Sequence, residues 1–223
     1  MKYLLSIFVL FLSLSLMSEG LTVYKIKGEK PGKTLMIIGG IHGNETSGYL
    51  AARQYANVKL KRGNLIVVPD ANAPAIKENK RFINVDMNRI FDEENGTTYE
   101  YKTVEQIKKL ISESDMVVNL HETSTKGSIV MIDDKKLEKI ANKVIKTVNR
   151  STKKIRLVLY NYRTASNNTG YKEQRRSLTY YAYYKKKIPA FAVDLSREIS
   201  DLGDRVEVQT LAVDAFMDEL GIE

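Results

Sequence analysis

The sequence predicts an α/β fold in three layers, with a mostly parallel mixed sheet flanked by helices. Short apolar runs such as 34–38 and 65–68 alternate along the chain with segments of helical periodicity. Strands that are buried on both faces read as continuous apolar runs, and they belong to parallel sheets with helices packed on each face. Strands that alternate with helices along the chain are typical of this fold class.

Seven segments are predicted to be strands. The first, 21–27, alternates apolar and polar residues and is expected at an edge of the sheet. One later segment, 155–162, also alternates. The remaining strands are expected at the apolar runs 34–38, 65–68, 115–120, 128–132 and 188–195.

Five segments are predicted to be helices, most of them because their apolar residues recur three or four positions apart. They are 45–57, 104–111, 137–148, 176–186 and 208–220. Two polar stretches without periodicity, 70–98 and 164–173, are predicted to be loops. A loop as long as 70–98 inside a compact domain usually serves a function.

Residues 1–20 are predicted to be a secretory signal peptide, and 21–223 a single domain. Lys2 precedes an apolar stretch, and the small residues Ser18 and Gly20 bound the expected cleavage range. The apolar stretch is shorter than the roughly 20 residues that a membrane-spanning helix needs, and an uncleaved anchor is the alternative. We therefore expect a periplasmic or secreted protein.

The chain has no cysteine, which excludes a thiol nucleophile, a disulfide framework and a lipidated cysteine. Its formal net charge is +8, with basic clusters at 59–62, 153–156, 175–176 and 185–187. None of these clusters lies in a nucleic-acid-binding motif, so no nucleic-acid partner is predicted. For an exported basic protein, an anionic wall polymer or membrane surface is the favoured partner class.

The two histidines of the chain each follow an apolar run. His42 lies in a glycine-rich turn after 34–38, three residues before Glu45, and His121 directly follows the run 116–120. Functional sites of open α/β sheets lie at the carboxyl ends of strands. Two imidazole nitrogens and one carboxylate, with a fourth position open, are typical of a catalytic zinc site. The alternative is that both histidines are ordinary polar residues.

Three motifs follow one another along the chain, namely His42-Gly43-Asn44-Glu45, Asp86-Met87-Asn88-Arg89 and Leu120-His121. Carboxypeptidase A-like zinc peptidases have motifs in this order, and the chain from about Thr34 onward resembles that family. The stretch 81–91 resembles most the bacterial branch that trims peptidoglycan stem peptides and sets cell shape. The aspartoacylase and succinylglutamate desuccinylase branch shares much of the pattern. The resemblance implies a zinc carboxypeptidase-like fold and one zinc ion bound by His42, Glu45 and His121.

The resemblance also implies residues that bind the substrate. Asn88 and Arg89 would hold the terminal carboxylate, and Arg81 would either do likewise or polarise the scissile carbonyl. A guanidinium group suits a carboxylate because it offers a planar pair of donors. The alternative is that Arg81 and Arg89 form surface salt bridges with nearby acidic residues. Tyr171 is a further candidate for substrate contact, because its loop precedes the last strand.

The general base of the family is a glutamate on a late strand, and here that position holds Asp194. Aspartate is one methylene shorter, and a misplacement of about 1 Å can cost about a hundredfold in rate. Glu198, four residues further on, is the alternative base. Zinc lowers the pKa of its bound water, but a carboxylate must still carry the proton to the leaving amine.

Three functions remain open. The first is a zinc carboxypeptidase that removes a terminal residue from an anionic peptide, with a peptidoglycan stem peptide (a muropeptide) as substrate. The second is a zinc amidohydrolase of N-acyl amino acids, which export disfavours because such substrates are mainly cytoplasmic. The third is a non-catalytic, zinc-bearing wall-binding module, motivated by Asp194. Longer wall carboxypeptidases carry additional domains, so a wall or scaffold partner is expected to localise this chain.

Overall fold

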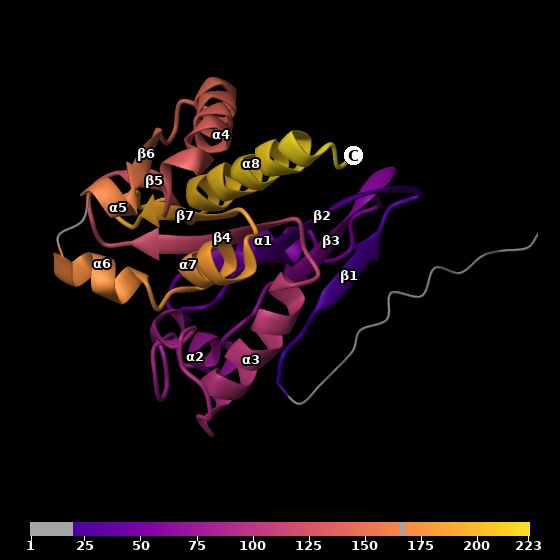
Figure 1. Ribbon diagram of the computed structural model, residues 1–223. Coiled ribbons are helices and arrows are strands. Elements are labelled where there is room, and N and C mark those ends of the chain that lie inside the picture. The colour runs from indigo at the N-terminus through magenta and orange to yellow at the C-terminus, as the bar shows by residue number, and fades with distance from the viewer. Residues whose placement is uncertain (1–19, 166–167) are drawn as a thin grey trace, which may run out of the picture.

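The computed structural model describes residues 20–165 and 168–223 (Figure 1). The predicted signal peptide lies outside the described residues except for Gly20. None of the helices in the described part of the chain combines the length and apolar character that a membrane crossing requires.

A seven-stranded mixed sheet forms the centre of the molecule, with strand order β1-β3-β2-β4-β7-β5-β6. Its strands β3, β2, β4 and β7 run parallel to one another, whereas β1 pairs antiparallel with β3 and β5 pairs antiparallel with β7. The predicted mostly parallel mixed sheet is confirmed, with the first strand at an edge. The strands are β1 (Tyr24–Lys27), β2 (Lys30–Ile38), β3 (Arg62–Val68), β4 (Met116–Thr123), β5 (Ser128–Ile132), β6 (Leu157–Asn161) and β7 (Ala190–Ser196).

Helices cover both faces of the sheet, as the sequence predicts (Figure 1). Side chains that alternate along β2 belong to different cores. Leu35 and Ile37 pack in a cluster with residues of α1, α4 and α8, whereas Met36 and Ile38 pack in a cluster with residues of α3 and α7 (Leu178–Tyr180). Burial on both faces explains the continuous apolar runs. The long helices are α1 (Thr46–Gln54), α3 (Tyr99–Ile111), α4 (Glu138–Ser151) and α8 (Leu202–Leu220).

The two segments predicted as loops contain short helices. The stretch 70–98 holds α2 (Ala73–Lys77) and the 3₁₀ turn η1 (Met87–Arg89), and 164–173 overlaps α5 (Tyr162–Ala165) and α6 (Asn168–Gln174). Helices this short carry no periodic apolar signal and depend on local caps, such as the Asn72 side chain that accepts from the Ala75 N–H. Two further short 3₁₀ or π segments are η2 (Lys135–Leu137) and η3 (Tyr181–Lys185), the latter directly after α7 (Leu178–Tyr180).

The helix predicted at 208–220 begins earlier, at Leu202. Asp201 caps its first turn by accepting a hydrogen bond from the Asp204 N–H at 2.8 Å. Asp and Ser are common N-cap residues, and the cap lies in a polar stretch without apolar spacing. The early start adds Arg205 to the helix. Arg205 and Gln209 both contact the end of β4, where Arg205 donates to Glu122 and Gln209 to the His121 carbonyl.

Candidate active site

A glycine-rich turn after β2 delivers His42 and Glu45 to the carboxyl edge of the sheet. Gly40 has φ +69°, a left-handed conformation that glycine adopts without strain. A Cβ atom on Gly43 would lie 2.1 Å from the Ala75 carbonyl carbon, so only glycine allows α2 to approach this turn. His121 reaches the same edge on β4, which pairs parallel with β2.

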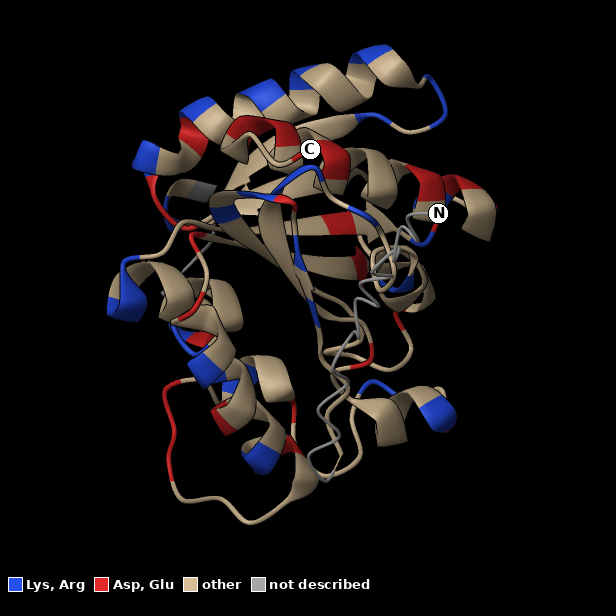
Figure 2. Cartoon of the chain, turned by 90° about the vertical axis from the view of Figure 1, so that its right-hand side faces the viewer, with Lys and Arg blue, Asp and Glu red and all other residues tan. Residues whose placement is uncertain are grey.

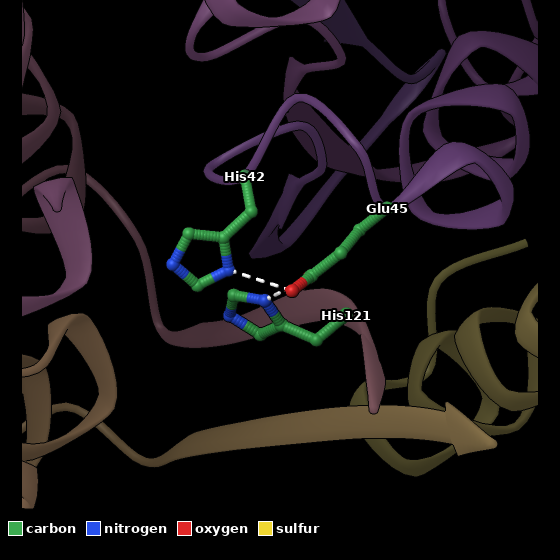
Figure 3. A group of neighbouring side chains, drawn as sticks. All are labelled: His42, Glu45 and His121. Carbon is green, nitrogen blue, oxygen red and sulfur yellow. Dashed lines mark hydrogen bonds and ion pairs between the residues drawn. The ribbon is translucent and has the colours of Figure 1, made fainter. Parts of the chain in front are cut away.

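The carboxylate of Glu45 lies between two imidazole rings (Figure 3). Its Oε1 is 2.8 Å from His42 Nδ1, and its Oε2 is 2.7 Å from His121 Nδ1. Burial by itself raises the pKa of Glu45, but the two histidines outweigh it and hold the pKa well below its usual range. All three side chains are buried, so this carboxylate is a fixed anion between two nitrogen donors.

The second nitrogen of each ring has a different environment. His42 Nε2 lies 2.9 Å from Asp86 Oδ1, and this contact orients the ring so that Nδ1 points toward Glu45. Asp86 Oδ1 also accepts the Asn88 N–H at 2.9 Å. His121 Nε2 is buried, and no partner for it is found among the described residues. The strand carrying His121 is fixed instead through its backbone, because Gln209 donates to the His121 carbonyl at 2.8 Å.

These three residues fit a metal ion. One ligand atom from each of His42, Glu45 and His121 lies within 4.8 Å of the others, and the set of two imidazole nitrogens and one carboxylate is typical of catalytic sites with an open position. Asp86 accepts a hydrogen bond from the outer nitrogen of His42, and a carboxylate in this position is the usual second partner of a ligating histidine. The structure therefore supports the predicted metal triad, while the identity of the metal as zinc stays a prediction.

A cavity of about 230 Å³ opens at this triad. Seven residues named from the sequence line it: His42, Glu45, Arg81, Asn88, Arg89, His121 and Asp194. Five further lining residues were not predicted: Glu122, Thr123, Met131, Tyr162 and Gln174. Tyr162 and Gln174 come from the helical stretch after β6, where no motif or periodicity distinguishes them. Their place in the cavity depends on tertiary packing alone.

Glu198 and Tyr171 are the two predicted residues that do not line the cavity. Glu198 is exposed in the loop after β7, where its N–H donates to Ser196 Oγ at 3.3 Å. Tyr171 packs edge-on against Tyr180, with ring centroids 6.5 Å apart. The roles assigned to these residues, as to those in the cavity, stay predictions.

Asp194 faces the triad from the neighbouring strand. It is paired in register with His121 across β4 and β7, and both side chains point to the same face of the sheet. Burial raises the pKa of the Asp194 carboxyl, the nearby Glu45 raises it further, and the histidines oppose both effects. A carboxyl group whose pKa is raised toward neutrality is suited to accept and release a proton.

The arginines of the cavity differ in how firmly they are held. Arg81 donates to Asp86 at 3.1 Å and to Glu45 at 3.3 Å, so the predicted alternative of local pairing describes part of its environment. Arg89 donates to the Asn88 carbonyl at 2.9 Å, and its ion pair with the exposed Glu173 is long, at 3.8 Å. Asn88 accepts the Leu178 N–H at 3.0 Å, so the amide nitrogen is the donor that Asn88 offers to the cavity.

Comparisons with known proteins agree with this geometry. The sequence model of a protein family, the succinylglutamate desuccinylase/aspartoacylase catalytic domain, matches residues 31–181. Aspartoacylase of Rattus norvegicus is 32% identical over 123 residues, which cover 48% of this chain and 39% of that protein. The chain thus spans about two fifths of the length of this curated relative.

Solved structures of the cell shape determinant Csd4 from Helicobacter pylori are similar over most of the chain. The tripeptide-bound form is 27% identical with a TM-score of 0.80, and the match covers 91% of this chain and 56% of that chain. The mDAP-bound form, described as a D,L-carboxypeptidase, is 28% identical with a TM-score of 0.74, covering 86% of this chain and 52% of that chain. These matches extend beyond the residues that the family model covers.

Proposed function

This chain belongs to the succinylglutamate desuccinylase/aspartoacylase family of hydrolases, and on that premise we propose that it is a zinc-dependent carboxypeptidase. The proposed substrate is an anionic peptide, namely a peptidoglycan stem peptide, met in the periplasm or outside the cell. One observation carries the proposal: the metal triad, two arginines and the half-buried Asp194 carboxylate line a single cavity. The likeness to Csd4, solved with a tripeptide and with mDAP, supports a peptide substrate.

His42, Glu45 and His121 would hold the zinc ion, which when bound polarises a carbonyl group and lowers the pKa of water. Arg89 and the amide nitrogen of Asn88 would bind the terminal carboxylate, because the guanidinium group supplies two parallel donors and the amide a third. Arg81 is within 3.3 Å of Glu45 and would turn toward the scissile carbonyl oxygen. The Asp194 carboxylate would accept a proton from the attacking water and release it to the leaving amine.

An amidohydrolase of N-acyl amino acids is the second candidate. The family model and the identity to aspartoacylase favour it, and the region that the family model matches includes the triad, Arg81 and Arg89. Both functions use a substrate with a free carboxylate, so the two differ in what lies on the other side of the scissile amide bond. Turnover of a tripeptide stem and of N-acetylaspartate by the same zinc-loaded protein separates them.

The substrate proposal is tested by amidation of the terminal carboxylate. We expect wild type to hydrolyse the free-acid peptide and to be slow on its amide. Arg89→Lys should lose about 10- to 100-fold in kcat/KM on the free acid. The lysine ammonium is a point charge, and it replaces a bidentate charged hydrogen bond worth roughly 1.5–3 kcal/mol. Its metal content should stay that of wild type. Equal turnover of both peptides by wild type would exclude the carboxypeptidase.

The base assignment is tested by Asp194→Asn, with Glu198→Gln as the matched control. We expect Asp194→Asn to lose about 10²- to 10⁴-fold in kcat while retaining metal, because the proton acceptor is removed and its shape is kept. Glu198→Gln should retain most activity, since Glu198 is exposed and lies outside the cavity lining. An active Asp194→Asn together with an inactive Glu198→Gln would reverse the assignment. Zinc binding without turnover by wild type would favour a binding module.

A further inference from the structure

The whole net charge of the chain resides in one segment of 22 residues. Residues 135–156 contain nine lysines and arginines and a single acidic residue, Glu138. Removing these ten from the totals of 35 basic and 27 acidic residues leaves 26 of each. The formal charge of +8 is therefore not spread over the surface, as it is in a protein whose charge serves only solubility.

The structure places this segment on an outer edge of the molecule. It covers η2, α4 and the loop into β6, and all nine basic residues are exposed. The opposite side of α4 is apolar, and its Ala141, Val144 and Val148 pack into the core. Figure 2 shows Lys and Arg along the uppermost helix, which is α4. We call these nine exposed side chains the basic ridge.

Acidic residues of α8 flank the basic ridge along one side. Glu219 pairs with Lys143 at 2.8 Å, and Asp204 and Glu207 each pair with Lys154 at 2.8 Å. For the other seven basic residues no ion pair is found within the described part of the chain. The basic ridge is thus a narrow row of positive side chains with acidic side chains of α8 along one side, and it is not the centre of a broad positive surface.

This shape selects the class of partner. A flat anionic bilayer would meet the acids of α8 together with the ridge, whereas a linear chain could follow α4 and avoid them. Lys139, Lys143, Lys146 and Arg150 follow one another at three- and four-residue steps, which places neighbouring side chains about 5–6 Å apart. Repeated charges at this spacing suit a polymer that carries an anionic group on each unit.

The composition of the ridge argues against nucleic acid. Residues 135–156 contain no aromatic side chain, whereas surfaces that bind single strands stack bases on aromatic rings. Seven of the nine basic residues are lysines, which act as point charges and require no fixed geometry of the anion. Binding by such a surface depends on the density of charge along the polymer.

We propose that the basic ridge binds an extended polyanion without bases, a flexible chain with a phosphate or carboxylate group on each unit. The ridge is formed by residues outside the cavity, so this proposal is independent of the proposed hydrolase activity. The bound polymer releases its counterions, and the affinity therefore falls steeply as salt rises.

The test measures the binding of inorganic polyphosphate and of poly-L-glutamate, labelled and of matched length, by fluorescence anisotropy at several salt concentrations. The ridge variant is Lys139→Gln, Lys146→Gln and Arg150→Gln. The control variant is Lys59→Gln, Lys61→Gln and Arg62→Gln, a second exposed basic cluster with no ion pair among the described residues. Each removes three positive charges, so the variants have the same net charge and differ only in place.

We expect the ridge variant to bind at least about tenfold more weakly at low salt, and the control variant to change by less than about twofold. The slope of log K against log salt should fall by about 2 in the ridge variant alone, since each contact with a single-stranded polyanion contributes roughly 0.7. Removing a neighbour that neutralises the ridge, by Glu219→Gln, should strengthen binding. Unchanged melting temperatures show that all variants are folded.

Three results would overturn the proposal. The first is no binding of either polymer by wild type at low salt. The second is an equal loss of affinity in the ridge and control variants, which would mean that the net charge of the protein alone determines the affinity. The third is tighter binding of an oligonucleotide, or of vesicles containing anionic lipid, than of either polymer at the same salt.

Discussion

Two buried carboxylates meet at the end of β4 and differ in their nearest partners. Glu45 lies between the imidazole rings of His42 and His121, and the nearest guanidinium groups, those of Arg81 and Arg197, are 3.3 Å and 3.9 Å from its Oε1. Glu122 points to the other face of the strand, where Arg205 donates to it at 2.9 Å and Arg197 lies 3.4 Å away. The two residues are joined, because the Glu122 N–H donates to Glu45 Oε2 at 3.1 Å.

The partners of a buried glutamate determine whether it can bind a metal ion or serves only to stabilise the fold. An arginine is always protonated and has no lone pair to give, so the arginines around Glu122 neutralise it permanently. A neutral imidazole has a lone pair, so the histidines around Glu45 can bind a cation with it. Glu122 also accepts the Ser47 N–H at 3.1 Å, which ties the start of α1 to β4 behind the triad.

A third buried carboxylate, that of Asp133 at the end of β5, has neither kind of partner among the described residues. It accepts from Gln174 Nε2 at 2.8 Å, and its Oδ2 is buried without a partner in the described part of the chain. Burial raises the pKa of Asp133 to about 6. The three buried carboxyl groups thus differ in their nearest partners, which are histidines for Glu45, arginines for Glu122 and neutral groups for Asp133.

The largest effect is expected from Glu45→Gln. Losing one charged ligand should weaken metal binding by about a thousandfold, since the apparent binding free energy of about 10–16 kcal/mol is shared among a few ligands. Metal content after dialysis, measured by plasma mass spectrometry, and a competition titration with a chelator check this. Stoichiometric metal in Glu45→Gln, or in the double variant His42→Ala and His121→Ala, would contradict the assignment of the triad.

Glu122→Gln should lower the stability of the fold and leave metal binding unchanged. We expect the free energy of unfolding to fall by about 4 kcal/mol, because Arg205 is left nearly buried without its anion, while metal content is retained. Urea unfolding of the metal-free proteins measures the change. The matched control is Arg197→Gln, which should cost less than about 1 kcal/mol because Arg197 is 36% exposed. If Glu122→Gln lost metal without losing stability, the two carboxylates would not have separate roles.

Asp133→Asn should change the dependence of stability on pH. The folded-state pKa of about 6 exceeds the ordinary value of 3.8, so the folded state binds this proton more tightly and loses stability as pH rises through that range. Above pH 6 the loss is complete and amounts to at most about 3 kcal/mol. The variant should therefore have a higher melting temperature than wild type at pH 8 and an equal one near pH 3.5. A stabilisation that is the same at both values would show that Asp133 does not titrate.

Local pattern was enough to predict the strands, the four long helices and the spacing of two ligands, although not the short helices α2, α5 and α6 or the start of α8. Apolar runs predicted strands because both faces of the sheet are covered, and His42 and Glu45 lie close because one turn carries both. Of the basic clusters identified in the sequence, only 153–156 belongs to the basic ridge. The four basic residues of α4 lie three or four positions apart, and they form one line because the helix brings them to the same outer face.

Only the tertiary structure decided which distant residues share the cavity. Strand register sets Asp194 beside His121, whereas Glu198, only four residues further, is exposed because the chain has left the sheet. Gln174 enters the cavity through its hydrogen bond to Asp133, and Arg205 reaches Glu122 because α8 begins at Leu202. These contacts join residues 41 and 83 positions apart, and no local pattern records them, because packing and strand pairing of the whole chain determine which side chains meet.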